Sequence, residues 1–477
     1  MLIPRLQLSS SPLLLAAIAL VGLWIVRTIS RRKGRLPLPP GPPADPIIGH
    51  LRFFPTKDVG EHFHEWSKIY GDVMYLKCLG RDIIVLDSVE AATELLDKRG
   101  ALHSCRPKMT VYQLMGWTSA LTLMQYGKRF IKHRRMLHDF LNQHKCLDYI
   151  PIQTEEARKL VRNIMKEPDR FRNYLARFAA SVILRVSYGQ KIESDSDPFL
   201  KMVHDVTEAV NSGGSPGNTV VDFFPWWTAE YSFAQHHLTE MDANPNPDPE
   251  HLEDIAGSAG VMYAAGADTT YSTLTTFVLL MTLHPEYQRK AQEEIDAVVG
   301  HNRLPDYSDR SSLPFLECVV QETLRWYPVV TIGVPHRAME DDIYNGYLIP
   351  KGSMIFANIR GMSLNEAIYR EPHRFMPTRF LPKPQGNGEP YFESVWGFGR
   401  RICVGEHFAN ASLWLAIASI LATLDIRKAK DGNGSDITPN VEFTTGMIQI
   451  PAPYECSIRA RNSTAEQLVH STLEDDL

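Results

Sequence analysis

Residues 396–405, WGFGRRICVG, constrain this chain most, because they set a cysteine in a glycine-rich loop directly before an apolar segment. Gly399 and Gly405 permit turns and close backbone approach that a Cβ would obstruct. Cys403 would lie near the start of a helix expected over residues 406–424, where free N–H groups favour the thiolate. A buried structural cysteine is the ordinary alternative. The loop predicts a thiolate lying against a flat macrocycle.

A second motif, AGADTT at residues 265–270, falls within a long apolar segment predicted to be helical over residues 254–284. A threonine hydroxyl can bond to a carbonyl one turn back, and together with glycine this bends a helix. A kinked helix with two satisfied polar residues is therefore one interpretation. The other is proton delivery, since an acid and a positioned hydroxyl, Asp268 and Thr269, are the pair that this chemistry needs.

A third motif is Glu322-x-x-Arg325, which places two charges on one helix face. Alone it is a weak signal, because such pairs are usually solvated. Here it lies in a largely apolar stretch that ends at Pro328, and burial would demand that both charges be paired.

The three motifs, in this order and spacing, resemble those of the cytochrome P450 superfamily. The chain departs from the family pattern with Trp396 where phenylalanine is usual and Val404 where proline is common. The resemblance implies a mainly α fold with small β-sheets (α+β), the cytochrome P450 fold. It also implies haem b as cofactor, with its iron bound by the Cys403 thiolate, which favours O–O cleavage.

The resemblance also implies roles for the other motif residues. Asp268 would relay protons and Thr269 would hold the hydrogen-bond network around dioxygen. Glu322 and Arg325 would bond Arg379, which lies in a segment where Thr378 stands in place of the usual glutamate. This triad is predicted to be structural.

Arginines are expected to hold the haem propionates, because buried carboxylates call for charge-assisted donors. By position in the family motifs the candidates are Arg134, Arg337 and Arg401. Phe130 replaces the family's tryptophan beside Arg134 and so lacks an indole N–H. The expected haem-binding residues therefore comprise these four together with Trp396, Gly399, Cys403 and Gly405.

The N-terminus predicts a membrane anchor. Residues 9–26 are apolar and basic residues follow them, which marks the cytoplasmic side. A cleaved signal peptide is the alternative, although no small-residue cleavage site follows. We therefore expect an N-terminal transmembrane helix and basic flank over 1–35 and a proline-rich hinge over 36–43. The expected location is the endoplasmic reticulum membrane, with a single pass and a cytosolic body.

The catalytic domain is predicted to span residues 44–462, followed by a polar, solvated tail over 463–477. It looks shortened around 226–250, where family members carry a lid loop and a further long helix. Lids exclude water and control access, so a wider distal opening is expected. By resemblance, substrate contacts would come from residues 109–121, 261–273, 329–333 and 444–448.

A net charge of −5 gives no reason to expect nucleic acid, and no dinucleotide-binding GxGxxG motif follows a strand. By resemblance, electrons come from a separate NADPH-cytochrome P450 reductase, with cytochrome b5 as a second donor. The predicted function is a monooxygenase that inserts one atom of O2 into a lipophilic terpenoid or polyketide. Two alternatives stay open: a haem-thiolate isomerase or dehydratase, and a catalytically degenerate haem-binding protein.

Overall fold

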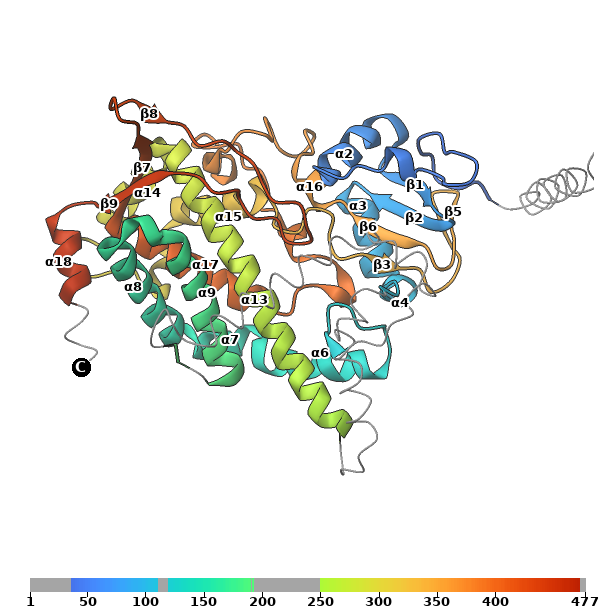
Figure 1. The fold of residues 1–477 in the computed structure, drawn as a ribbon, viewed down its shortest axis with the longest axis horizontal. Coiled ribbons are helices and arrows are strands. Elements are labelled where there is room, and N and C mark those ends of the chain that lie inside the picture. The colour runs from blue at the N-terminus through green and yellow to red at the C-terminus, as the bar shows by residue number, and fades with distance from the viewer. Residues whose placement is uncertain (1–35, 110–118, 190, 193–248, 472–477) are drawn as a thin grey trace, which may run out of the picture.

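The computed structural model describes residues 36–109, 119–189, 191–192 and 249–471. Within these ranges the fold is mostly helical with three small sheets, as the sequence predicts. A sheet-rich part lies at one end of the molecule and a helical body at the other (Figure 1). The helix α13 (Pro249–Leu283) runs diagonally along the helical body, past α9 and toward β7 (Figure 1).

The main sheet is built from both ends of the chain. Its hairpin, β1 (Val73–Cys78) with β2 (Arg81–Leu86), is antiparallel. Strand β2 then pairs in parallel with β6 (Met354–Ala357), which pairs with β3 (His336–Arg337). The sheet therefore joins segments more than 200 residues apart, as one catalytic unit requires.

Helices cover this sheet and lead into the helical body. Apart from short 3-10 helices, the remaining described elements before α13 are α2 (Val59–Tyr70), α3 (Val89–Ala92), the π-helical turn η2 (Thr93–Lys98), α4 (Gly100–His103), α6 (Lys128–Leu141), α7 (Gln143–Asp148), α8 (Ile150–Lys166) and α9 (Phe171–Tyr188). Those after it are α14 (Pro285–Val298), α15 (Pro314–Trp326), β4 (Asp342–Tyr344), β5 (Tyr347–Ile349), α16 (Ile359–Ser363), α17 (Glu406–Thr423), β7 (Leu424–Lys430), β8 (Asp436–Ile437), β9 (Cys456–Ala460) and α18 (Ser463–Ser471).

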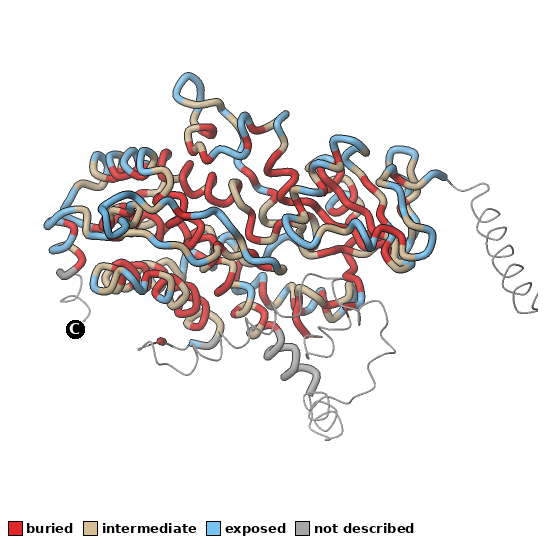
Figure 2. Tube along the Cα trace, turned by 45° about the horizontal axis from the view of Figure 1, so that its top comes forward, coloured by how far each residue is buried: buried red, intermediate tan, exposed pale blue. Residues whose placement is uncertain are grey.

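The largest core cluster lies between α8, α9, α13, α15 and α17. Helix α17 is buried nearly all round, and its Trp414 is fully buried. Figure 2 shows these buried segments running through the interior while the connecting loops are exposed. Because α17 begins three residues after Cys403, this core fixes the position of the cysteine loop.

The predicted triad is one buried cluster. Arg325 Nε donates to Glu322 Oε2 at 2.7 Å, Arg379 Nε donates to Glu322 Oε1 at 3.0 Å, and all three side chains are fully buried. Glu389, which the sequence analysis did not single out, accepts from Arg379 Nη1 at 2.6 Å. Glu389 thus gives Arg379 a second carboxylate partner, in the segment where Thr378 stands in place of the family's usual glutamate.

Of two expectations about the chain ends, one is wrong and the other is not tested. Residues 463–471, predicted to be solvated tail, form α18, whose Ala465 and Val469 are buried. Apolar residues at this spacing share one helix face, which packs on the body. The expected transmembrane segment lies outside the described residues. Within the described part of the chain, no helix combines the length and hydropathy needed to span a bilayer.

Candidate active site

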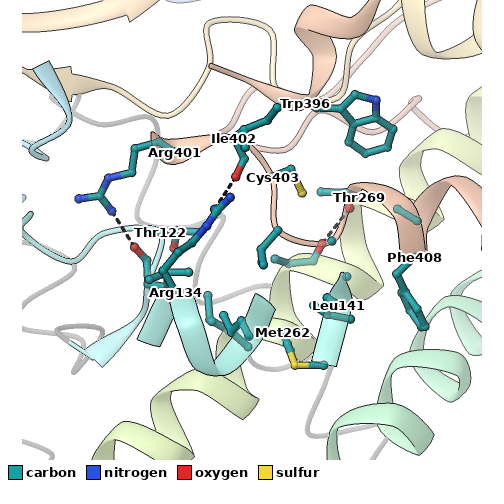
Figure 3. Close-up of a pocket in the computed structure, with 18 of the residues that line it drawn as sticks. Thr122, Arg134, Leu141, Met262, Thr269, Trp396, Arg401, Ile402, Cys403 and Phe408 are labelled. Carbon is teal, nitrogen blue, oxygen red and sulfur yellow. Dashed lines mark hydrogen bonds between the residues drawn. The ribbon is translucent and has the colours of Figure 1, made fainter. Parts of the chain in front are cut away.

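A cavity lies between α6, α9, α13 and the loop before α17, with about 890 Å³ of non-atom space that includes its opening to solvent. Most residues that line it are apolar, among them Leu137, Ile183, Val261 and Phe408. Arg134 on α6, Thr269 on α13, and both Arg401 and Cys403 in the loop before α17 line it (Figure 3). An apolar cavity with a few converging polar groups is the usual form of a cofactor or ligand site.

The cysteine loop is held by a backbone contact and by one obligatory glycine. Gly399 has φ +54°, and a Cβ there would lie 2.3 Å from the Leu96 carbonyl oxygen. Gly399 therefore lets the loop pack on η2 and does not line the cavity. Gly405 does line it, but a Cβ there would meet the Cys403 sulfur at an ordinary 3.9 Å. The close approach predicted for Gly399 is therefore present, but toward η2, whereas no contact at Gly405 requires a glycine.

Cys403 is exposed to the cavity that it lines. Burial within the protein raises the pKa of its thiol, although the Gly405 N–H and the positive charge of Arg134 act in the opposite direction. The expected lowering by the start of α17 is therefore outweighed by desolvation. A bound metal cation would reverse this balance, since a coordinating thiol loses its proton.

Arg401 is a buried cation at the cavity. Its guanidinium donates to three backbone carbonyls, those of Ser104, Leu121 and Met124, and its Cζ lies 3.7 Å from the centroid of the Phe130 ring. Burial lowers the pKa of Arg401 to about 10. Phe130 thus supports the arginine through a cation–π contact, a role that needs no indole N–H.

Arg106 is a second buried cation that lines the cavity, and the sequence analysis missed it. It donates to the carbonyl oxygens of Thr122, Val334 and Pro335, and burial lowers its pKa well below the usual value. Within the described chain, neither Arg106 nor Arg401 forms an ion pair with a carboxylate. Arg106 is recognisable as a site residue only because it is buried, and the Arg-Pro dipeptide in the sequence does not reveal that burial.

The two remaining predicted cations have different positions. Arg134 lines the cavity, and its Nη1 donates to the Ile402 carbonyl at 2.5 Å, which ties α6 to the cysteine loop. Arg337 does not line it; its Nη2 contacts Cys105 Sγ and Gln125 Oε1, each at 3.1 Å. Its Nε is buried and lacks a hydrogen-bond partner among the described residues. An unmet buried donor on a cation indicates an absent acceptor.

Helix α13 brings Thr269 and Gly266 to the cavity. Thr269 Oγ1 donates to the Ala265 carbonyl at 2.8 Å, the bond to the preceding turn that the sequence predicts, so its lone pairs remain available as acceptors. Asp268 is buried and is not among the lining residues. Gly266 also permits close helix packing, because a Cβ there would lie 3.1 Å from Ile183 Cγ1 on α9.

The structure therefore gathers one set of the predicted residues at the cavity and leaves another set outside. Those that line it are Phe130, Arg134, Thr269, Trp396, Arg401, Cys403 and Gly405. Those that do not are Asp268, Arg337 and Gly399. Of the expected substrate-contact segments, the lining includes Leu121 and residues of 261–270, but none of 329–333 or 444–448.

This donor set fits haem. A flat apolar macrocycle with two carboxylates suits an apolar cavity that holds one accessible sulfur and buried guanidinium groups with no carboxylate partner in the described chain. When bound, the haem supplies one-electron and dioxygen chemistry. Cys403 would supply a sulfur ligand to the iron, and the buried arginines would supply counter-charges to the carboxylates.

Comparison with known proteins agrees with this site. The sequence model of the family described as Cytochrome P450 matches residues 39–231 and 227–457. A cytochrome P450 monooxygenase of Postia placenta is 36% identical over 512 aligned positions, which cover 98% of each chain. One of Armillaria gallica is 36% identical over 95% of this chain and 97% of its own. Another, of Ampulloclitocybe clavipes, is 33% identical over 96% and 91%.

The chain belongs to the cytochrome P450 family. It is a haem-dependent monooxygenase, an oxidoreductase whose haem iron carries a cysteine thiolate as axial ligand. It resembles fungal members of the family along nearly its whole length.

Proposed function

We propose that the enzyme inserts one oxygen atom into an unactivated C–H bond of a lipophilic substrate, a terpenoid or polyketide skeleton, with Cys403 as the axial ligand. The observation that carries this proposal is that the Cys403 sulfur and Thr269 border one mainly apolar cavity. Such a lining favours an apolar molecule held by few polar contacts. The second oxygen atom leaves as water.

The cavity residues have separate tasks in this proposal. Arg106, Arg401 and Arg134 hold the propionates or the loop, and Thr269 accepts hydrogen bonds at the position where protons must arrive. Asp268, buried on the same helix, passes protons toward that position through water. Electrons come from a membrane-bound NADPH-cytochrome P450 reductase, assisted by cytochrome b5, with residues 9–26 anchoring the enzyme in the endoplasmic reticulum.

Replacing Thr269 with valine tests the proton-delivery role. Valine keeps the shape of the side chain and removes the hydroxyl, so the fraction of NADPH converted to product should fall by about tenfold or more, with peroxide released instead. Thr275→Val is the matched control, because Thr275 makes the same bond to the preceding turn and does not line the cavity. Equal coupling in both variants would remove Thr269 from the proposal.

Replacing Asp268 with asparagine separates a monooxygenase from an isomerase or dehydratase. A monooxygenase should lose most of its NADPH-dependent turnover, whereas an enzyme that rearranges an oxygenated substrate needs neither NADPH nor the acid. Turnover without NADPH, unaffected by Asp268→Asn, would favour that alternative.

One observation keeps the degenerate haem protein as a second candidate. The family match falls into two stretches that meet at residues 227–231, inside the segment predicted to be shortened. The 512-position alignment is longer than the 477-residue chain, so the Postia relative carries residues that this chain lacks. The predicted short segment lies outside the described residues. Peroxide release without product from every lipophilic substrate class, with a normal haem site, would favour this candidate.

A further inference from the structure

Gln449 lies where three segments far apart in the sequence meet. Its backbone N–H donates to the Val329 carbonyl at 3.0 Å, and its own carbonyl accepts from Ser272 Oγ at 2.6 Å. The main-chain groups of residue 449 therefore join the segment after α15 to helix α13, where the Ser272 hydroxyl is the donor. Ser272 is three residues beyond Thr269, so the junction lies within one turn of the cavity.

The Gln449 side chain adds two further bonds. Its Oε1 accepts from Tyr327 Oη at 2.6 Å, and its Nε2 donates to Thr331 Oγ1 at 3.2 Å. Gln449 and Thr331 are 8% and 6% exposed, so these bonds are shielded from water. The Tyr327 ring stacks on Phe443, with centroids 3.4 Å apart and planes 5° apart. Both ends of the amide are thus satisfied by the one segment 327–331.

Ser272 differs from its neighbours on α13. Thr269, Thr273, Thr275 and Thr276 each donate to the carbonyl four residues earlier on their own helix. Ser272 instead donates to a different segment, at Gln449. A hydroxyl that leaves its own helix and is fully buried fixes that helix relative to its partner.

A bound haem would occupy the part of the cavity beside the Cys403 sulfur, so a substrate must extend beyond that part. Segments 329–333 and 444–448, expected to contact substrate, do not line the cavity itself. Their position relative to Thr269 is set through the Gln449 junction. A small displacement of segments that border a bound ligand is enough to change the orientation of that ligand.

We propose that Gln449 is a positioning residue that determines ligand fit above the haem, because its side chain holds segment 327–331 to segment 443–451 while its carbonyl ties both to α13. This inference rests on the proposed function, since it takes those segments to bound the substrate. Gln449 touches neither haem nor substrate, and its effect passes through the segments it joins.

The test uses the haem-loaded full chain and two iron ligands of different size. The affinity for imidazole depends on the haem iron alone. The affinity for 4-phenylimidazole also depends on the shape of the segments that border the space above the iron. Gln449→Leu should weaken 4-phenylimidazole about tenfold, with imidazole changed less than about twofold. Gln288→Leu is the matched control, because Gln288 is 2% exposed and bonds both backbone groups of Ile426 away from the cavity.

The readout separates positioning from loss of stability. Both leucine variants should lower the melting temperature, but only Gln449→Leu should change the ratio of the two dissociation constants. Tyr327→Phe, which removes one bond of the junction, should shift that ratio in the same direction by less. An unchanged ratio in Gln449→Leu, or an equal change in Gln288→Leu, overturns the inference. Failure of the wild-type protein to bind imidazole would instead overturn the haem site, and the inference with it.

Discussion

The backbone N–H of Cys403 donates a hydrogen bond of 2.8 Å to the carbonyl oxygen of Trp396, and this bond closes the loop that directs the sulfur into the cavity. Because the bond joins main-chain atoms, it does not depend on the side chain at position 396. The tryptophan found in place of the family's usual phenylalanine therefore leaves the loop geometry intact.

Trp396→Phe should consequently retain thiolate ligation. The backbone bond is unaffected, and phenylalanine keeps an apolar ring in the lining, so haem content should stay near that of the wild type. Absorbance spectroscopy of the purified variant measures this directly. Loss of the thiolate spectrum would show that the indole itself, and not the backbone, holds the loop.

Glu322→Gln should destabilise the fold strongly. It leaves the buried guanidinium groups of Arg325 and Arg379 short of a counter-charge, which costs about 3–5 kcal/mol in the free energy of unfolding. Glu371→Gln, at an exposed pair with Arg374, should cost less than about 1 kcal/mol. Denaturant unfolding compares the two, and similar losses would contradict a structural role for the buried triad.

Arg106→Met should reduce haem retention. Removal of a buried cation that has no carboxylate partner in the described chain takes away a charge-assisted bond to a propionate, and haem should transfer to an acceptor protein about tenfold faster. Arg360→Met is the control, since Arg360 is equally buried, pairs with Glu61 and lies off the cavity. The control should lower stability without selective haem loss. Equal haem loss in both variants would remove Arg106 from the site.

Gly266→Val should distort the junction of α13 with α9. Its Cβ would press on Ile183, at a cost of about 1–3 kcal/mol in stability, and both residues line the cavity. Adding Ile183→Ala should recover part of the loss, because it removes the atoms in the way. A double-mutant cycle of melting curves measures this coupling, and strictly additive effects would contradict the predicted contact.

Local sequence patterns were enough to predict the helices α13 and α17 and the charge pair Glu322–Arg325, whereas Arg379 was added by the family resemblance. Each depends on periodicity, capping or paired charges within a short window. The partners of β2 could not be predicted in this way, because β6 lies more than 260 residues further along the chain. The helix α18 was missed because its buried face has few apolar residues in an otherwise polar segment.

The candidate site shows the same division. Cys403, Thr269 and Arg401 were identifiable because each lies in a motif whose spacing carries the chemistry. Arg106 and Gln449 were not, since their importance comes from burial and from partners distant in the sequence. Arg337 was placed in the lining by its motif, whereas the structure directs its Nη2 to Cys105 and Gln125.

The carbon monoxide difference spectrum of the reduced protein, compared between wild type and Cys403→Ser, tests the central claim most directly. A thiolate on haem iron gives a Soret band at distinctly longer wavelength than a nitrogen or oxygen ligand. We predict that the wild-type protein shows this long-wavelength band and that Cys403→Ser loses it while keeping the fold. A wild-type protein without the band, or a serine variant that retains it, would contradict the assignment of Cys403 as the axial ligand.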